Sequence, residues 1–218
     1  MFIDLGVNNL ATVLDGGGIS SPHIVNGKPV KAINQYYNKQ LAKLKSRMKH
    51  NYKIDSLGRK IYYKSWSNKG KPIVQGSSKA TRKLTTKRNN KIANYFHKSS
   101  KKIVDWAVEN GNKYIVIGKN KGWKNKINLG KKTNQSFTQI PFARLINLIS
   151  YKAQTKGIQV IVVEESYTSK VDHLAGEPME HHGQYKWTRK HRGLFVSSTG
   201  IHLNADINGA IGIWRKVS

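Results

Sequence analysis

Four carboxylates stand where an enzyme could use them, in a 218-residue chain that has only 11 Asp and Glu against 39 Lys and Arg. Asp4 lies within "FIDLG", Glu164 and Glu165 end the apolar run "IQVIVV", and Asp206 precedes "INGAIGIW". If these segments converge, their oxygens form a site suited to Mg²⁺ or Mn²⁺. Two such ions about 4 Å apart hold the attacking and leaving oxygens in phosphodiester hydrolysis. The acids therefore predict a metal-dependent nuclease site.

The two aspartates also fit ordinary structural roles. Because side chains alternate along a strand, Asp4 points away from its apolar neighbours, and the alternative interpretation is an edge-strand acid that faces solvent. Asp206 directly precedes apolar residues spaced three and four apart, and aspartate at such a position often caps a helix. The two interpretations differ in whether the carboxylates meet.

The adjacent glutamates cannot both point in the direction of Asp4, because successive side chains of a strand face opposite ways. One of Glu164 and Glu165 is expected to join the site, and the other is expected to form a salt bridge with a nearby lysine. The residues alone do not decide between the two.

The spacing of apolar residues predicts the elements that must position these acids. Strands are predicted at 2–6, 9–14, 18–25, 113–118 and 158–165. Helices are predicted at 29–50, 88–111, 140–157 and after Asp206. Loop-rich stretches are predicted at 51–81, 119–137 and 167–203, the last with a hairpin about Thr199 and Gly200. This order is that of an RNase H-like α/β domain, a mixed sheet flanked by helices.

The charge of the chain indicates a polyanionic partner. The formal net charge is +28, and residues 39–102 alone hold 20 of the 39 basic residues against one acid, Asp55. Aromatic residues are interspersed in this insertion, and rings can stack on unpaired bases while lysine and arginine neutralise phosphates, so it is predicted to bind DNA or RNA. The alternative is that the rings pack in a core and the lysines only solubilise. No apolar stretch reaches the length of about 18 residues that a membrane span needs. Nothing at the start marks secretion, so no membrane association and a cytoplasmic location are expected.

Four segments carry a resemblance to a known family. "IDLGVNNLAT", "HKSSKKIVDWA", "LISYKAQTKGIQVIVVEESYTSK" and "NADINGAIGI" resemble the TnpB (OrfB) proteins of bacterial insertion sequences, relatives of the type V CRISPR effector nucleases. The resemblance covers nearly the whole chain. It implies a single RuvC-like nuclease domain of RNase H fold over residues 1–218, guided by RNA, that cuts DNA through an Asp, Glu, Asp set with Mg²⁺, and a nucleoid-associated location in a bacterial cell.

The resemblance assigns two acids and leaves the third displaced. Asp4 matches the first acid of the family's set, and Asp206 matches the third. In most of the family the glutamate ends the central strand, where this chain has Gly118 and a lysine. We favour relocation of the glutamate to Glu164 or Glu165 over a broken site.

The family usually carries two cysteine pairs of a zinc ribbon in the segment that corresponds here to about 168–203, which has no cysteine. No zinc is therefore expected. The histidines of this segment match no zinc spacing and are interpreted as exposed loop residues, namely His173, His181, His182, His191 and His202. Its acids Asp172, Glu177 and Glu180 are interpreted as solvated. The family also has a large N-terminal portion, whereas this chain begins three residues before Asp4, so a remnant, half of a split protein and a standalone domain stay open.

These observations predict the endonuclease domain of a transposon-encoded protein that acts on DNA, with guide RNA as a partner if an N-terminal portion is supplied. The alternative is a catalytically inactive, truncated nucleic-acid-binding remnant or repressor. A third interpretation, an RNA-binding structural protein of the same fold, explains the charge but not the acids at strand ends and at a helix start.

Overall fold

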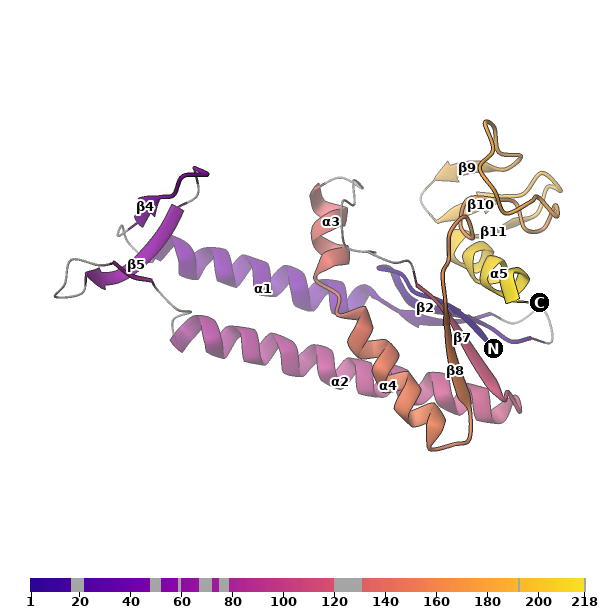
Figure 1. Ribbon diagram of the computed structural model, residues 1–218, viewed down its shortest axis with the longest axis horizontal. Coiled ribbons are helices and arrows are strands. Elements are labelled where there is room, and N and C mark those ends of the chain that lie inside the picture. Colours follow the sequence, from indigo (N-terminus) through magenta and orange to yellow (C-terminus); the bar gives the residue numbers. More distant parts are fainter. Residues whose placement is uncertain are drawn as a thin grey trace. The chain divides into compact units, whose positions relative to one another are not determined.

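The computed structural model describes residues 1–16, 22–47, 52–58, 60–66, 72–74, 79–119, 131–191 and 193–217. The chain divides into two units (Figure 1). The sheet unit comprises Met1–Lys31 and Asn94–Ser218, and the basic unit comprises Ala32–Ala93. Two long helices, α1 (Lys28–Arg47) and α2 (Lys79–Glu109), each begin in one unit and end in the other.

A five-stranded mixed sheet forms the centre of the sheet unit. Its strands are β1 (Phe2–Asp4), β2 (Asn9–Leu14), β3 (His23–Asn26), β7 (Tyr114–Gly118) and β8 (Gln159–Val163). The order is β3-β2-β1-β7-β8, with antiparallel pairs from β3 to β1 and parallel pairs from β1 to β8. The predicted meander and the two later strands are thus confirmed. The carboxyl ends of β1, β7 and β8 meet at one edge, because parallel strands point the same way.

Helices cover both faces of this sheet. Figure 1 shows α5 (Ala205–Val217) above the sheet, and α4 (Phe142–Gln154) with the end of α2 below it. Ala210 and Ile211 of α5 are buried against Leu14 of β2. On α2 and α4 the buried residues recur at helical spacing and include Phe96, Ile103, Ala107, Leu145 and Ile149. Burial of these apolar stripes fixes the helices on the sheet and so positions the residues at its edge.

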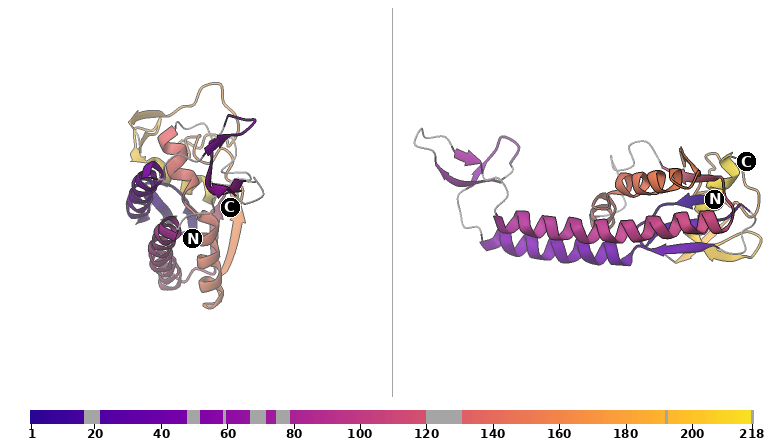
Figure 2. Two further views of the ribbon diagram at one scale, coloured as in Figure 1. Left: turned by 90° about the vertical axis from the view of Figure 1, so that its left-hand side faces the viewer. Right: turned by 90° about the horizontal axis from the view of Figure 1, so that it is seen from below.

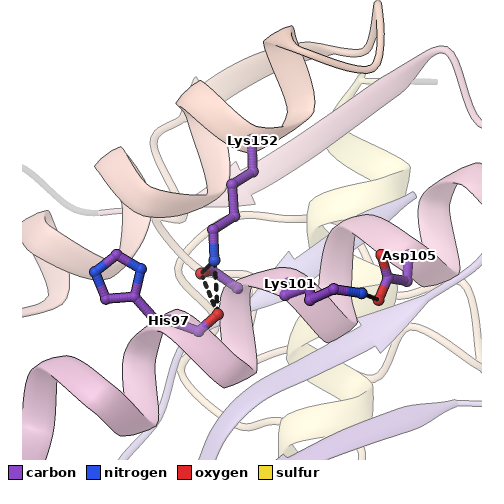
Figure 3. A network of polar contacts seen from close by, with 5 residues as sticks. His97, Lys101, Asp105 and Lys152 are labelled. Atoms are coloured by element: carbon purple, nitrogen blue, oxygen red, sulfur yellow. Dashed lines mark hydrogen bonds and ion pairs between the residues drawn. The ribbon is translucent and has the colours of Figure 1, made fainter.

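A polar contact joins α4 to α2 within the sheet unit. The Lys152 ammonium donates to the His97 carbonyl oxygen at 2.6 Å and to Ser100 Oγ at 2.8 Å (Figure 3). One turn further along α2, Lys101 and Asp105 form an ion pair at 2.6 Å. Burial lowers the pKa of Lys152, and the charge of Lys101 lowers it further. The contact holds α4, and therefore the adjoining strand β8, in one position against α2.

The basic unit contains more regular structure than its sequence predicts. The predicted loop at 51–81 contains three short antiparallel strands, β4 (Tyr52–Ile54), β5 (Lys60–Trp66) and β6 (Pro72–Val74) (Figure 2). Frequent lysines between the aromatic and β-branched residues hide the strand pattern. Helix α2 begins at Lys79, nine residues before the predicted start at 88. The Arg88 guanidinium donates to Asn34 Oδ1 at 2.8 Å, which joins the two helices inside this unit.

Of the aromatic residues in the predicted nucleic-acid-binding insertion, Phe96 packs in the core of the sheet unit with no exposed surface. For Phe96 the alternative interpretation, that the rings of the insertion pack in a core, is therefore the correct one. Tyr95 is half-buried. The side chains of Tyr52, Tyr62, Tyr63 and Trp66 lie outside the described part of the structure.

Two further differences concern the second half of the chain. A short helix, α3 (Lys131–Thr138), lies in the predicted loop 119–137. Residues 166–204 end in a three-stranded antiparallel sheet of β9 (Thr188–His191), β10 (Leu194–Val196) and β11 (His202–Asn204). The predicted hairpin is confirmed, because Val196 pairs with His202 across the turn that contains Thr199 and Gly200. In the described parts of the chain no helix is both long and apolar enough to cross a bilayer.

Asp172 is buried rather than solvated, which corrects the sequence-based interpretation. Its carboxylate accepts hydrogen bonds from Ser197 Oγ at 2.9 Å and from the Ser198 N–H at 2.7 Å and Ser198 Oγ at 3.1 Å. Burial alone would raise the pKa of Asp172, but these bonds outweigh it and lower the pKa. The serines lie 25 and 26 residues away, so local sequence carries no sign of the contact.

Glu177 and His173 are also buried, contrary to the interpretation as solvated and exposed side chains. Glu177 Oε2 accepts the Asp172 N–H at 2.6 Å. The His173 ring lies between the Thr168 carbonyl oxygen, 2.6 Å from Nε2, and the Arg215 guanidinium, 3.2 Å from Nδ1. Burial lowers the pKa of His173. His181, His202 and Glu180 are exposed as predicted, His182 is half-buried, and the side chain of His191 lies outside the described residues.

Candidate active site

Asp4 stands at the end of β1 beneath helix α5. In the parallel register of β1 and β7, Phe2 pairs with Val116 and Ile3 with Ile117, so the next pair is Asp4 and Gly118. Asp4 lies on the face that α5 covers, because a Cβ atom added at Gly209 of α5 would lie 2.9 Å from Asp4 Oδ2. Burial raises the pKa of Asp4 well above its usual range, and the charges of Glu165 and Asp206 raise it further. The three carboxylates are therefore near enough to interact electrostatically.

Asp206 occupies the first turn of α5, but the helix is capped by another residue. The side-chain oxygen of Asn204 accepts the Asp206 N–H at 2.9 Å, which leaves the Asp206 carboxylate available for other contacts. Asn9, the first residue of β2, donates from Nδ2 to Asp206 Oδ2 at 2.8 Å. Asn9 thus fixes one oxygen of this carboxylate, and no feature of its sequence position distinguished it beforehand.

Glu165, and not Glu164, turns toward the site. A Cβ atom added at Gly118 would lie 2.6 Å from Glu165 Oε2, so the glutamate carboxylate occupies the space that a side chain at the end of β7 would need. Burial raises the pKa of Glu165 to about 7, although the charge of Lys216 lowers it. Glu164 is exposed to solvent. The structure brings Asp4, Glu165 and Asp206 together and leaves Glu164 outside the group.

Two glycines give the carboxylates their room. An added Cβ would lie 2.6 Å from Glu165 Oε2 at Gly118 and 2.9 Å from Asp4 Oδ2 at Gly209, so glycine at these positions reflects the close approach of the charged side chains. Gly6 also lies near the site, but glycine is required there by the backbone, because an added Cβ would lie 2.7 Å from the Asn9 carbonyl oxygen.

Comparison with known proteins gives the family. The model of the OrfB_IS605 family, described as "Probable transposase", matches residues 2–124, which is more than half of the chain. The chain belongs to the OrfB_IS605 family. A second family model, the Cas12f1-like TNB domain, matches residues 142–213. The resemblance to TnpB (OrfB) proteins is thereby confirmed.

Individual relatives of this OrfB_IS605 protein include viral and archaeal proteins. The TnpB-like protein ORF457 of Acidianus two-tailed virus is 24% identical over 216 residues, which cover 98% of this chain and 41% of that protein. The Cas12f2 endodeoxyribonuclease of a Micrarchaeota archaeon is 32% identical over 130 residues, 55% of this chain and 23% of that protein. The protein is thus TnpB-like and related to the Cas12 nucleases, and it spans less than half the length of these two relatives.

Solved structures share the fold. A Cas12f1–sgRNA–target DNA complex superimposes with a TM-score of 0.61 and 16% identity over 97% of this chain and 48% of the matched chain. A CRISPR-Cas12f ternary complex superimposes with a TM-score of 0.63 and 18% identity over 97% of this chain and 37% of that chain. The mixed sheet with its flanking helices is therefore similar to the corresponding part of Cas12f.

The donor set of the OrfB_IS605 site suits a hard divalent cation. It consists of carboxylate oxygens from two strand ends and one helix, supported by the Asn9 amide, and neither sulfur nor histidine is among them. Burial is the main reason that the pKa of Asp4 is raised, and repulsion by Glu165 and Asp206 adds to it; a bound cation would relieve this repulsion. In the described residues no group of three or more Asp, Glu, His or Cys is already arranged to hold a metal ion.

The raised pKa values predict that the stability of the metal-free protein falls as the pH rises, and that the stabilising effect of Mg²⁺ grows. A carboxyl group whose pKa rises from 4.5 to about 7 on folding stabilises the fold below the unfolded value and loses that contribution as the pH rises through about 7. In EDTA the unfolding temperature should therefore fall between about pH 5 and about pH 8. Mg²⁺ binds the deprotonated groups, so its stabilising effect should be larger at about pH 8 than at about pH 6.

Differential scanning fluorimetry with and without Mg²⁺ measures both effects. Glu165→Gln should reduce the pH dependence in EDTA and leave the part that belongs to Asp4, whereas Asp105→Asn, a change at an exposed ion pair of α2, should keep all of it. An unfolding temperature that rises with pH in EDTA would contradict this account of the site.

Proposed function

We propose that the chain is the nuclease domain of a TnpB-like protein, of RuvC type and RNase H-like fold, which hydrolyses phosphodiester bonds of DNA in a metal-dependent reaction. The observation that carries the proposal is the placement of the Asp4, Glu165 and Asp206 carboxylates at one edge of the sheet, in a chain whose net charge is +28. Three antiparallel strands followed by two parallel ones support the RNase H-like assignment.

Asp4, Glu165 and Asp206 would hold Mg²⁺ or Mn²⁺. When bound, such an ion supplies Lewis-acid stabilisation of phosphate oxygens and a water of lowered pKa. Asn9 donates a hydrogen bond to one oxygen of Asp206 and so orients the carboxylate. Metal ligands are commonly oriented by such hydrogen bonds from neighbouring residues. Gly118 and Gly209 leave the Glu165 and Asp4 carboxylates the space to approach a common centre.

The basic unit supplies charge for phosphate contacts. Exposed lysines recur every four residues along α2 within this unit and lie on one helix face, at Lys79, Lys83, Lys87 and Lys91. Asp55 is its one acid. Such a lysine row neutralises phosphates and makes binding depend on salt, whatever the base sequence.

We propose guide RNA and target DNA as partners because of the similarity to Cas12f and TnpB-like proteins. The solved structures with the same fold are Cas12f complexes, one of them with sgRNA and target DNA. This chain spans 41% of the viral TnpB-like relative and 48% of the matched Cas12f1 chain. We therefore assign DNA to the nuclease domain itself, and guide RNA to the protein when the remaining portion is supplied.

Cleavage of end-labelled single-stranded DNA with Mg²⁺ tests the proposal. Loss of a metal ligand removes several kcal/mol of transition-state stabilisation, so Asp4→Asn and Asp206→Asn should each reduce the rate by at least about 100-fold. Asp105→Asn is the control, because it also removes one carboxylate but at the exposed ion pair with Lys101. Cleavage that survives Asp4→Asn would refute the assignment. A chain that binds DNA and cuts nothing would be the nucleic-acid-binding remnant or repressor.

A further inference from the structure

Tyr167 has an unusual backbone conformation two residues after Glu165. Its φ is 65°, and among the described residues it is the one non-glycine residue with a positive φ. Bulky residues rarely adopt this left-handed region, because the Cβ atom approaches the neighbouring backbone. Strained residues of this kind concentrate at functional sites, where the surroundings hold them in place.

Hydrogen bonds on both sides of Tyr167 hold the turn. The Thr168 N–H and Oγ1 both donate to the Glu165 carbonyl oxygen, at 3.2 Å and 2.8 Å. The Lys170 N–H donates to the Tyr167 carbonyl oxygen at 3.0 Å, and the Trp187 indole N–H donates to the carbonyl oxygen of Lys170. The turn is therefore tied directly to the backbone of Glu165, so the backbone of Tyr167 is held close in the chain to the candidate site.

The ring of Tyr167 is left accessible rather than packed into the core. Tyr167 is 38% exposed, whereas the next residue of the same turn, Thr168, is buried. The Lys170 ammonium lies 5.9 Å from the ring centroid. An exposed aromatic face with a cation beside it matches the two parts of a nucleotide, a flat base and a negative phosphate.

We propose that Tyr167 is a stacking platform for an unpaired base of the nucleic acid strand that enters the candidate active site, with Lys170 contacting a phosphate of the same strand. The proposal rests on the proposed function and adds a substrate contact to it. The charge of the chain favours a nucleic acid over an apolar protein segment as the occupant. Because every base has a flat face that can stack on a ring, the affinity should depend little on the nucleotide sequence.

Binding is measured in the full chain that also carries Asp4→Asn, without Mg²⁺, so that no strand is cut. The probe is a short single-stranded oligothymidylate with one 2-aminopurine, whose fluorescence falls when the base stacks on an aromatic ring. Tyr167→Phe should keep the affinity and the quenching. Tyr167→Ala should weaken binding by about 5- to 150-fold, the range for loss of one stacked base, and remove the quenching.

Two further variants distinguish the effect of the Tyr167 ring from the effect of its backbone conformation and from the effect of removing any exposed tyrosine. Tyr167→Gly relieves the positive φ, so it should unfold at a temperature at least as high as Tyr167→Ala and yet bind as weakly. Tyr151→Ala is the matched control, because Tyr151 on α4 is 47% exposed and has the Lys152 ammonium 6.0 Å from its ring. Tyr151 comes before the start of β8 in the chain, whereas Tyr167 comes after its end. Replacement of Tyr151 should therefore leave binding unchanged.

Equal binding and quenching by the parent, Tyr167→Ala and Tyr167→Gly would overturn the proposal, and so would a parent that does not bind the probe. Equal loss in Tyr151→Ala would also overturn it, because the effect would then belong to exposed tyrosines in general. Failure here is distinguishable from failure of the proposed function. The binding assay needs no catalysis, and the cleavage assay compares only carboxylate variants.

Discussion

Glu165→Gln should reduce Mg²⁺-dependent cleavage by at least about 100-fold, because it removes a charged metal ligand from the site. Glu164→Gln should leave the rate within about threefold, as expected for an exposed surface residue. The two changes are chemically identical and lie one position apart, so a general effect of charge cannot explain a difference between them. Single-turnover cleavage of the same labelled strand measures both, and the reverse order of effects would contradict the geometry at Gly118.

A compensating pair of changes tests the same geometry more directly. The Glu165 carboxylate occupies the space beside Gly118, where an added Cβ would lie 2.6 Å from Oε2 and 2.5 Å from Ile213 Cδ1. Combining Glu165→Gly with Gly118→Glu would return a carboxylate to this space from the neighbouring strand, once the end of the Ile213 side chain has moved aside. The combination should cleave faster than Glu165→Gly alone, and Gly118→Gln in the same background is the uncharged control.

Asp172→Ala should lower the free energy of unfolding by about 3 kcal/mol, since buried donors lose the acceptor that satisfies them. The orphaned groups include Ser197 Oγ and the Ser198 N–H, and the Ala175 N–H also donates to this carboxylate, at 3.2 Å. Because hydrogen bonds lower the pKa of Asp172, its contribution is present above the unfolded value of 3.8 and is lost as the pH falls below that value.

Urea unfolding followed by circular dichroism measures this change. Glu180→Ala removes an exposed acid of the same segment and should shift the free energy of unfolding by no more than about 0.5 kcal/mol. If Asp172→Ala is as stable as the parent protein, the carboxylate does not hold this segment together.

The central sheet was predictable because its signals are local. Short runs of branched residues predicted five strands, with Asp4 inside the first strand and the two glutamates at the end of the last. Three questions about the site were left open: whether Asp4 and Asp206 have only structural roles, whether the glutamate is relocated or lost, and which of Glu164 and Glu165 joins the site. Strand β8 ends at Val163, so both glutamates lie beyond the regular alternation that would have decided between them. Asn9 was missed because its role depends on Asp206, which is 197 positions away.

The segment after β8 shows where sequence reasoning stops. Asp172 and Glu177 are charged residues among polar neighbours, and such residues are usually exposed. Their contacts include serines and an arginine from later parts of the chain, which no local pattern reveals. In the basic unit, by contrast, the charge was evident and the strands were not, because lysine interrupts the periodicity from which strands are recognised.

Helix α5 connects the candidate active site to the segment of residues 168–177. Asp206 stands in its first turn, while near its other end Arg215 donates to the carbonyl oxygens of Glu177 and Gly176, at 3.1 Å and 3.4 Å. Between them, an added Cβ at Gly212 would lie 2.6 Å from the Thr168 carbonyl oxygen. We therefore expect substitutions in residues 168–177 that shift α5 to shift the Asp206 carboxylate as well. Loss of cleavage in a variant of that segment identifies a substrate contact only when the orientation of α5 is shown to be intact.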